Sequence, residues 1–121
     1  MFPFSHYHSN THEALAIFQG EALLQFGGDA QSSVQEQVAA GDVLVIPAGV
    51  AHKQVKSSGN FTMVGAYPEG APHWDCLEGK GGCSEKSTAE HTICNVALPP
   101  LDPVLGNDLE APLQQYWQGA S

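Results

Sequence analysis

The sequence predicts an all-β protein built as one small β-sandwich or barrel. Short segments in the first half of the chain either alternate apolar with polar residues or are apolar throughout, as strands do. Glycine-containing turns separate these segments at close spacing. No stretch there repeats its apolar residues at helical spacing. With 121 residues, the chain is long enough for one compact domain with its own core.

The segments predicted as strands follow one another closely: 13–18, 21–26, 34–38, 43–46, 52–55 and 61–67. Segment 34–38 is mostly polar, so we expect it at a sheet edge. Segment 43–46 is a continuous apolar run, which is typical of a strand buried on both faces. Pro47 ends that run because proline has no backbone N–H to donate to a sheet.

The chain changes character after Pro68, where proline and glycine become frequent. We therefore predict a barrel core over residues 1–68 and a loop-rich C-terminal extension over 69–121, packed on the same domain. Segment 91–98 is expected to supply one more strand. Segment 109–117 is expected to form either a short helix or an apolar strap.

The charge balance excludes several classes of partner. Asp and Glu number 13 against 4 for Lys and Arg, which gives a formal net charge of −9. Nucleic acids and anionic membranes need basic patches, so neither is an expected partner. The chain has no apolar run of the roughly 18 residues that a membrane span needs, and no signal peptide is recognisable at its start. Three cysteines cannot all pair within one chain. We predict a soluble cytoplasmic protein.

The opening stretch holds a candidate metal site. His6 and His8 are two residues apart, so on an extended strand both imidazoles point to one face. Glu13 follows a polar stretch that resembles a turn, and a hairpin there would bring the carboxylate to the same surface. Two imidazoles and a carboxylate leave room on a divalent metal for a fourth group.

Two motifs in the right order identify a family. His6, His8, Glu13 and Gly20 fit the pattern H-x-H-x(3,4)-E-x6-G, and Gly41, Pro47, Gly49 and His52 fit G-x5-P-x-G-x2-H. Both patterns resemble the two motifs of the cupin superfamily. The stretches VGAYPEG and DPVLG are similar to those of small bacterial cupins, the YjlB-like proteins. The resemblance implies a single cupin-type (RmlC-like) jelly-roll barrel with His6, His8, Glu13 and His52 as metal ligands.

The sequence departs from the family pattern at two places. Lys56 stands where the second motif usually has Asn, a residue that is generally not a ligand. The glycine that opens the first motif would fall ahead of Met1, so the resemblance implies a barrel that lacks its N-terminal strands. Such a barrel would expose a sheet edge, and unpaired edges attract other chains. We therefore expect a homodimer that covers this edge.

The expected cofactor is one divalent transition metal: Fe, Mn, Ni, Zn or Cu. A mixed set of imidazole and carboxylate ligands suits each of these ions, and affinity order alone does not choose among them. Open coordination positions accept small chelating molecules such as enediols, diketones or hydroxy acids. The first hypothesis is an enzyme for a small oxygenated metabolite, either dioxygenase-like or isomerase-like. The alternatives are a non-catalytic metal-dependent binding module and a truncated cupin with a structural or interaction role.

Further residues have weaker expectations. Gln54, Met63 and Tyr67 are candidates for the mouth of the cavity, because Gln54 shares the strand parity of His52; ordinary packing is the alternative. His12 should face away from Glu13 and take a loop or surface role, with a role as metal ligand as the alternative. Lys56 is expected at a solvated strand end, with a contact to a substrate carboxylate as the alternative.

A second group of ligand-type residues lies in the C-terminal part: His73, Cys76, Cys83, His91 and Cys94. Their spacing matches no named zinc motif, so free cysteines are the expectation. A second metal site and a reactive thiol or disulfide pair are the alternatives. The aromatic residues Trp74, Tyr116 and Trp117 are expected as packing anchors or interface residues.

Overall fold

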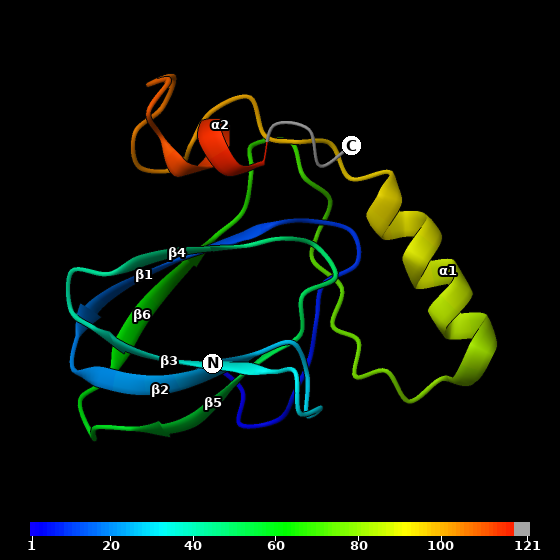
Figure 1. The fold of residues 1–121 in the computed structure, drawn as a ribbon, viewed down its shortest axis with the longest axis horizontal. Helices are drawn as coiled ribbons and strands as arrows, with labels where there is room; N and C mark the ends of the chain where they lie inside the picture. Colours follow the sequence, from blue (N-terminus) through cyan, green and yellow to red (C-terminus); the bar gives the residue numbers. More distant parts are fainter. Residues whose placement is uncertain (118–121) are drawn as a thin grey trace.

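Two three-stranded antiparallel sheets face each other in the computed structural model, which describes residues 1–117 (Figure 1). The strands are β1 Glu13–Gln19, β2 Glu21–Phe26, β3 Val34–Ala39, β4 Val43–Ile46, β5 His52–Ser57 and β6 Thr62–Ala66. One sheet has the order β4-β1-β6 and the other β3-β2-β5, with every pair antiparallel. This architecture confirms the predicted all-β jelly-roll barrel.

The core lies between the two sheets. Leu15 and Ile17 of β1 alternate with outward residues and face Ala22 and Leu24 of β2, all at most 2% exposed. Gly20 carries the chain from one sheet to the other with φ of 77°. A Cβ there would lie 2.6 Å from Oγ of Ser58 and 2.8 Å from Cα of Phe61, so only glycine fits.

The strand predictions for segments 13–67 agree with the structure, and β3 is an edge strand as expected. The expectation of burial on both faces is wrong for β4. This strand lies at the edge of its sheet, and Val43 on its outer face is 44% exposed. An apolar run therefore does not distinguish a central strand from an edge strand whose outer face is also apolar.

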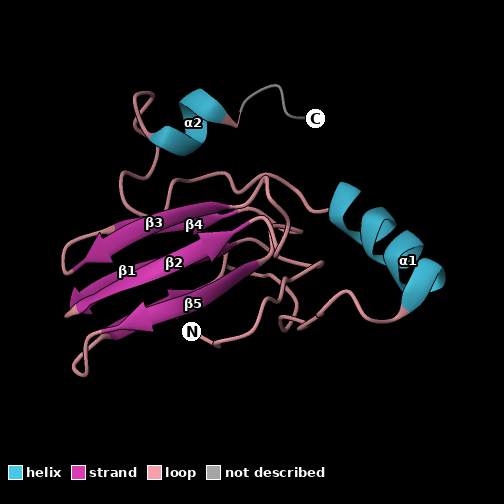
Figure 2. Cartoon of the chain, turned by 60° about the horizontal axis from the view of Figure 1, so that its bottom comes forward, coloured by secondary structure: helices cyan, strands magenta, loops and turns pink. Residues whose placement is uncertain are grey.

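The C-terminal part holds two helices, α1 Gly82–Cys94 and α2 Pro112–Tyr116. The strand expected over 91–98 is wrong, because α1 occupies residues up to Cys94. The helix expected within 109–117 is confirmed as α2. Both views place α1 beyond one end of the strands and α2 outside the barrel (Figure 2). No described helix combines the length and the apolar character needed to cross a membrane.

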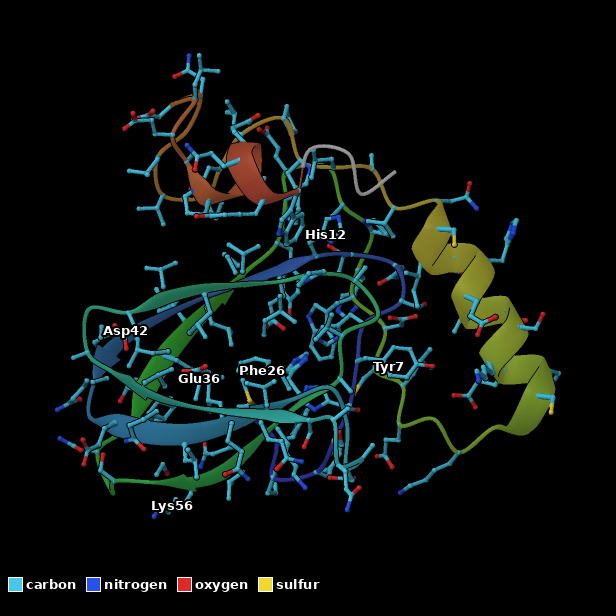
Figure 3. All side chains as sticks on the ribbon, in the orientation of Figure 1. Tyr7, His12, Phe26, Glu36, Asp42 and Lys56 are labelled. Atoms are coloured by element: carbon cyan, nitrogen blue, oxygen red, sulfur yellow. The ribbon has the colours of Figure 1, made fainter. Side chains whose placement is uncertain are left out.

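The N-terminal segment runs alongside β5 and builds one wall of the barrel. His6 and His52 exchange backbone hydrogen bonds of 3.2 and 2.8 Å. Tyr7 exchanges a second pair with Leu77, which returns in the loop after Pro68. Because side chains alternate, Tyr7 points outward on the side of α1, whereas its neighbours His6 and His8 are buried (Figure 3).

Candidate metal centre

Three buried histidines converge inside the barrel. His6 and His8 come from the N-terminal segment, and His52 is the first residue of β5. One ring nitrogen of each lies within 4.8 Å of those of the other two, and each side chain is at most 5% exposed. The antiparallel bridge between His6 and His52 brings their ring centroids to 4.3 Å.

The backbone fixes the tautomer of all three rings. Nδ1 of His6 lies 3.1 Å from the carbonyl oxygen of Phe4, and Nδ1 of His52 lies 2.9 Å from that of Val50. Nδ1 of His8 contacts the carbonyl oxygen of Asp75 in the same way. A carbonyl oxygen only accepts, so each Nδ1 carries the hydrogen. In the neutral ring this leaves the Nε2 lone pair free, which is how metal-ligating histidines are oriented.

Glu13 completes the cluster from β1. Its Oε2 lies 3.1 Å from Nε2 of His8 and 3.4 Å from Nε2 of His52. With Nδ1 protonated, these contacts place nitrogen lone pairs against a carboxylate oxygen, which is repulsive unless a cation stands between them. The donors present, three imidazole nitrogens and one carboxylate oxygen, therefore fit a divalent transition metal.

The electrostatics of the cluster favour a bound positive charge. Burial alone would raise the pKa of Glu13, but without a metal its contacts with His52 and His8 outweigh burial, since an imidazole that takes up a second proton at Nε2 donates to the carboxylate, and they lower the pKa to about 2. Burial opposes protonation of His8, yet the neighbouring Glu13 raises its pKa. His6 lies among the other histidines, and burial lowers its pKa. The carboxylate is thus ionised, and a proton or metal ion is needed to balance it.

The second oxygen of Glu13 is held separately. The hydroxyl of Tyr67 donates to Oε1 at 3.2 Å. Gly65 of β6 leaves room for this arrangement, since a Cβ at that position would stand 3.1 Å from Oε1. Burial and the charge of Glu13 raise the pKa of Tyr67 to about 12, so its phenol stays protonated and acts as a donor.

A cavity of about 320 Å³ opens onto the cluster. Its walls include two of the three residues expected at the cavity mouth, Met63 and Tyr67. Gln54 does not line it. The side-chain amide of Gln54 donates to the hydroxyl of Ser57 at 2.9 Å, and its backbone N–H donates to Phe2. The N-terminal segment therefore lies where strand parity placed Gln54, and Phe2 lines the cavity instead.

The loop after Pro68 contributes residues that the sequence patterns did not place at the site. Trp74 lines the cavity, with its ring centroid 5.3 Å from that of His8. Asp75 anchors this loop, because its carboxylate accepts hydrogen bonds from the backbone and hydroxyl of Ser9. No spacing rule connects this loop to the histidines. Its only sequence signal is an aromatic next to an acidic residue in a polar loop.

Two other candidates lie away from the cluster. Nδ1 of His12 accepts from the backbone of Ala48 at 2.9 Å, and its Nε2–H donates to Ala97 at 3.2 Å. His12 thus joins the barrel to the C-terminal segment (Figure 3). Lys56, near the end of β5, is exposed on the lower side of the barrel in the same view and lines a separate surface hollow.

The C-terminal histidines and cysteines form no second metal cluster. Among residues 1–117, the buried histidine triad is the group of ligand-type side chains close enough to hold an ion. Cys76, Cys83 and Cys94 are free and exposed. The expectation of unpaired cysteines agrees with this arrangement.

Comparisons with known proteins converge on one family. A family model described as Cupin matches residues 4–67, which include all four residues of the cluster. The chain is also 44% identical over 117 residues to a protein of Bacillus subtilis (strain 168) named "Uncharacterized protein YjlB". That alignment covers 97% of this chain and 67% of the Bacillus protein.

Proposed function

Because the chain belongs to the cupin family, we propose that it holds one divalent transition metal through His6, His8, Glu13 and His52 and acts on a small oxygenated metabolite. The observation that carries this proposal is the shared orientation of the three imidazoles. Each donates from Nδ1 to a backbone carbonyl, which leaves its Nε2 free. Three such imidazoles, together with a carboxylate, in one buried cluster favour metal binding.

The residues around the site determine what chemistry it supports. A bound divalent cation would supply Lewis-acid polarisation of a chelating ligand. Glu13 neutralises one charge and Tyr67 keeps that carboxylate in place. The aromatic and methionine walls restrict access of bulk water. We propose dioxygenase-like oxidation as the first reaction class and isomerisation as the second.

A non-catalytic binding module is the second candidate function. The observation that favours it is the scarcity of proton-transfer groups. Apart from the four proposed ligands, Tyr67 is the one titratable side chain that lines the cavity, and its phenol is a poor base.

Measurements of oxygen uptake and product formation with a panel of small chelating metabolites distinguish the enzyme from the binding module. Saturable binding of a metabolite without its conversion to a product would support the binding module.

Elemental analysis of protein purified without added metal tests the centre itself. We expect about one equivalent of transition metal per chain. The double substitution His8→Ala with His52→Ala should abolish it. The matched control removes two exposed histidines, His73→Ala with His91→Ala, and should retain the metal. Equal metal content in all three proteins, or its loss in the control alone, would contradict the proposed site.

Tryptophan fluorescence gives an independent test of where the metal binds. The chain has two tryptophans, so Trp117→Phe leaves Trp74 as the single tryptophan, which can be excited selectively over tyrosine. Trp74 lies 5.3 Å from His8, and a paramagnetic ion such as Co²⁺ at the site should quench it. Titration of metal-free Trp117→Phe protein should therefore saturate at the same stoichiometry as the elemental analysis. Unquenched emission alongside bound metal would place the ion elsewhere.

The expected homodimer and the cytoplasmic location remain proposals. Three exposed, unpaired cysteines suit a reducing compartment. The dimer expected from the sequence covers a sheet edge. The structure favours a different contact, an uncovered apolar face of the β4-β1-β6 sheet, where Phe18, Val43 and Val64 are each more than two-fifths exposed.

A further inference from the structure

We propose that the cavity at the metal centre takes a planar aromatic chelator that carries at most one negative charge. This inference rests on the proposed function, since the metal is the group that the ligand would chelate. Two independent features of the cavity support it: an aromatic wall beside the histidines, and the absence of any lysine or arginine from its lining.

The aromatic wall is formed by Trp74 and Tyr67. Their rings are nearly parallel, with an interplanar angle of 17° and centroids 6.2 Å apart. Both rings meet His8 edge to face, at centroid distances of 5.3 and 6.1 Å. The wall therefore begins directly at a proposed metal ligand. A flat ring attached to a chelating group would lie against these faces, which aromatic contacts favour.

The remaining walls suit a ligand of about one ring. Phe2, Met1 and Met63 close the cavity with apolar atoms, and methionine adapts its shape to aromatic partners. The volume of about 320 Å³ lies at the low end of the range of ligand pockets. A long chain or a sugar-sized polyol would find few hydrogen-bonding partners here. A single ring with two adjacent oxygens matches both the size and the surface.

The charges around the cavity disfavour polyanions. The chain has four lysines and no arginine, and all four lysines lie outside the lining: Lys53, Lys56, Lys80 and Lys86. Lys53 and Lys80 are paired with acidic neighbours. The acidic side chains that act on His8 are those of Glu13 and Asp75. A divalent ion with Glu13 leaves about one net positive charge, which balances one ionised oxygen of a chelator. The N-terminal amine of Met1 is the other cationic group near Glu13, and burial lowers its pKa. A further carboxylate or phosphate would find no lysine or arginine in the lining.

A set of hydroxamates with one chelating head and three different arms tests this inference. The probes are acetohydroxamate, benzohydroxamate and 4-carboxybenzohydroxamate, titrated into cobalt-loaded protein while the visible absorption of the cobalt is followed. We expect benzohydroxamate to bind about tenfold more tightly than acetohydroxamate, because its ring is buried against aromatic faces. We expect the carboxylated probe to bind more weakly than benzohydroxamate, and the difference to shrink as salt is added.

Substitutions at the two tryptophans test whether the aromatic wall causes the preference for the aryl probe. Trp74→Ala should lose the preference for the aryl arm and keep its cobalt content, whereas Trp117→Ala should keep both. Trp74→Phe should retain part of the preference, which covers the case in which the alanine variant folds poorly. Equal affinity for the acetyl and benzoyl probes, or tighter binding of the carboxylated one, overturns this inference alone. A protein that binds no cobalt overturns the proposed function and this inference with it.

Discussion

The hydroxyl of Tyr67 donates a hydrogen bond of 3.2 Å to Oε1 of Glu13, while Oε2 of the same carboxylate faces His8 and His52. The two oxygens of Glu13 thus have separate roles. One is held by a neutral phenol on the segment after β6, and the other is directed at the histidines. This division favours ligation through a single carboxylate oxygen, and it makes Tyr67 a positioning residue for the centre.

Tyr67→Phe should weaken metal binding without removing a ligand. Loss of the phenol frees Glu13 to rotate, and removal of such outer hydrogen bonds typically costs about tenfold or more in affinity. Competition for zinc against a chromophoric chelator measures the effect. Tyr116→Phe is the matched control, because Tyr116 is 77% exposed on α2. Equal affinities for the two variants would show that Tyr67 does not position Glu13.

The metal-free protein should lose stability in acid through Glu13. Its pKa is about 2 in the folded protein against an ordinary value of 4.5. A depressed carboxylate pKa contributes stability above the unfolded value, and that contribution is lost as the pH falls toward the folded value. Glu13→Gln should therefore be less stable than the parent by about 2 kcal/mol near neutral pH, and this gap should narrow below the ordinary pKa of 4.5 and close near the folded pKa of about 2. His8, whose pKa is raised, contributes in the opposite sense, and its stabilisation fades as the pH rises above its folded pKa.

Urea unfolding of the two metal-free proteins at several pH values measures that gap. Lys53→Gln, at an exposed pair on the outer face of β5, serves as a control whose difference from the parent should be small. A gap that stays constant from neutral pH to strong acid would show that the Glu13 cluster is not the source of the acid sensitivity.

The strands and the four ligand candidates were predictable because both depend on local patterns. Alternation in residues such as Leu15 and Ile17 fixes which face is buried, and motif spacing places His52 opposite His6. The walls of the cavity were less predictable. Trp74 reaches the site through a loop held by Asp75 and Leu77, and loop paths leave no periodic signal. Gln54 does not line the cavity as expected, because the alternation of side chains along β5 carries no information about the N-terminal segment that pairs beside Gln54.

Helix α1 was missed for a different reason. Ala89 is its one buried residue, so its sequence carries no apolar stripe of helical period. Thr88 and Thr92 form hydrogen bonds back to carbonyls four residues earlier, within the helix itself. The apolar residues near its end, Ile93 and those that follow, resembled the start of a strand. In the structure Ile93 belongs to α1 and lies against Gly49 in the loop before β5.

Gly49→Ala should disturb the contact between α1 and the loop of the second motif. Gly49 has φ of 87°, and a Cβ there would lie 2.7 Å from Cδ1 of Ile93. Gly41 is the matched control, since its φ is 101° and a Cβ would meet nothing within 4 Å. Both substitutions impose backbone strain, but the first also overpacks the interface and should cost about 1 kcal/mol more in urea unfolding.

A double-mutant cycle isolates that contact. Ile93→Ala in the Gly49→Ala background should recover part of the lost stability, and in the Gly41→Ala background it should recover none. The backbone N–H of Gly49 donates to the carbonyl of His8, so the zinc affinity of Gly49→Ala should also fall. If Gly49→Ala and Gly41→Ala lower the free energy of unfolding by the same amount, Ile93 moves aside without an energetic cost.

The outer face of the β4-β1-β6 sheet should mediate the proposed dimer. Val43, Ala16 and Val64 are aligned across the three strands and point outward, and Phe18 extends the row with 60% exposure. At the other end of this face, Ala14 and Val45 line a cavity together with residues of the C-terminal segment. No charged residue lies among the outward residues of these strands, so two copies can meet there although each carries a formal charge of −9.

Phe18→Asp should convert the dimer into a monomer. The substitution places one carboxylate in each copy at a face that would be paired with itself, which costs both desolvation and repulsion. Sedimentation velocity measures the mass of each protein. Leu109→Asp adds the same charge at a residue that is 80% exposed in the C-terminal segment, and it should remain dimeric. A parent protein that sediments as a monomer would contradict the dimer. A Phe18→Asp protein that stays dimeric would instead move the contact to a sheet edge.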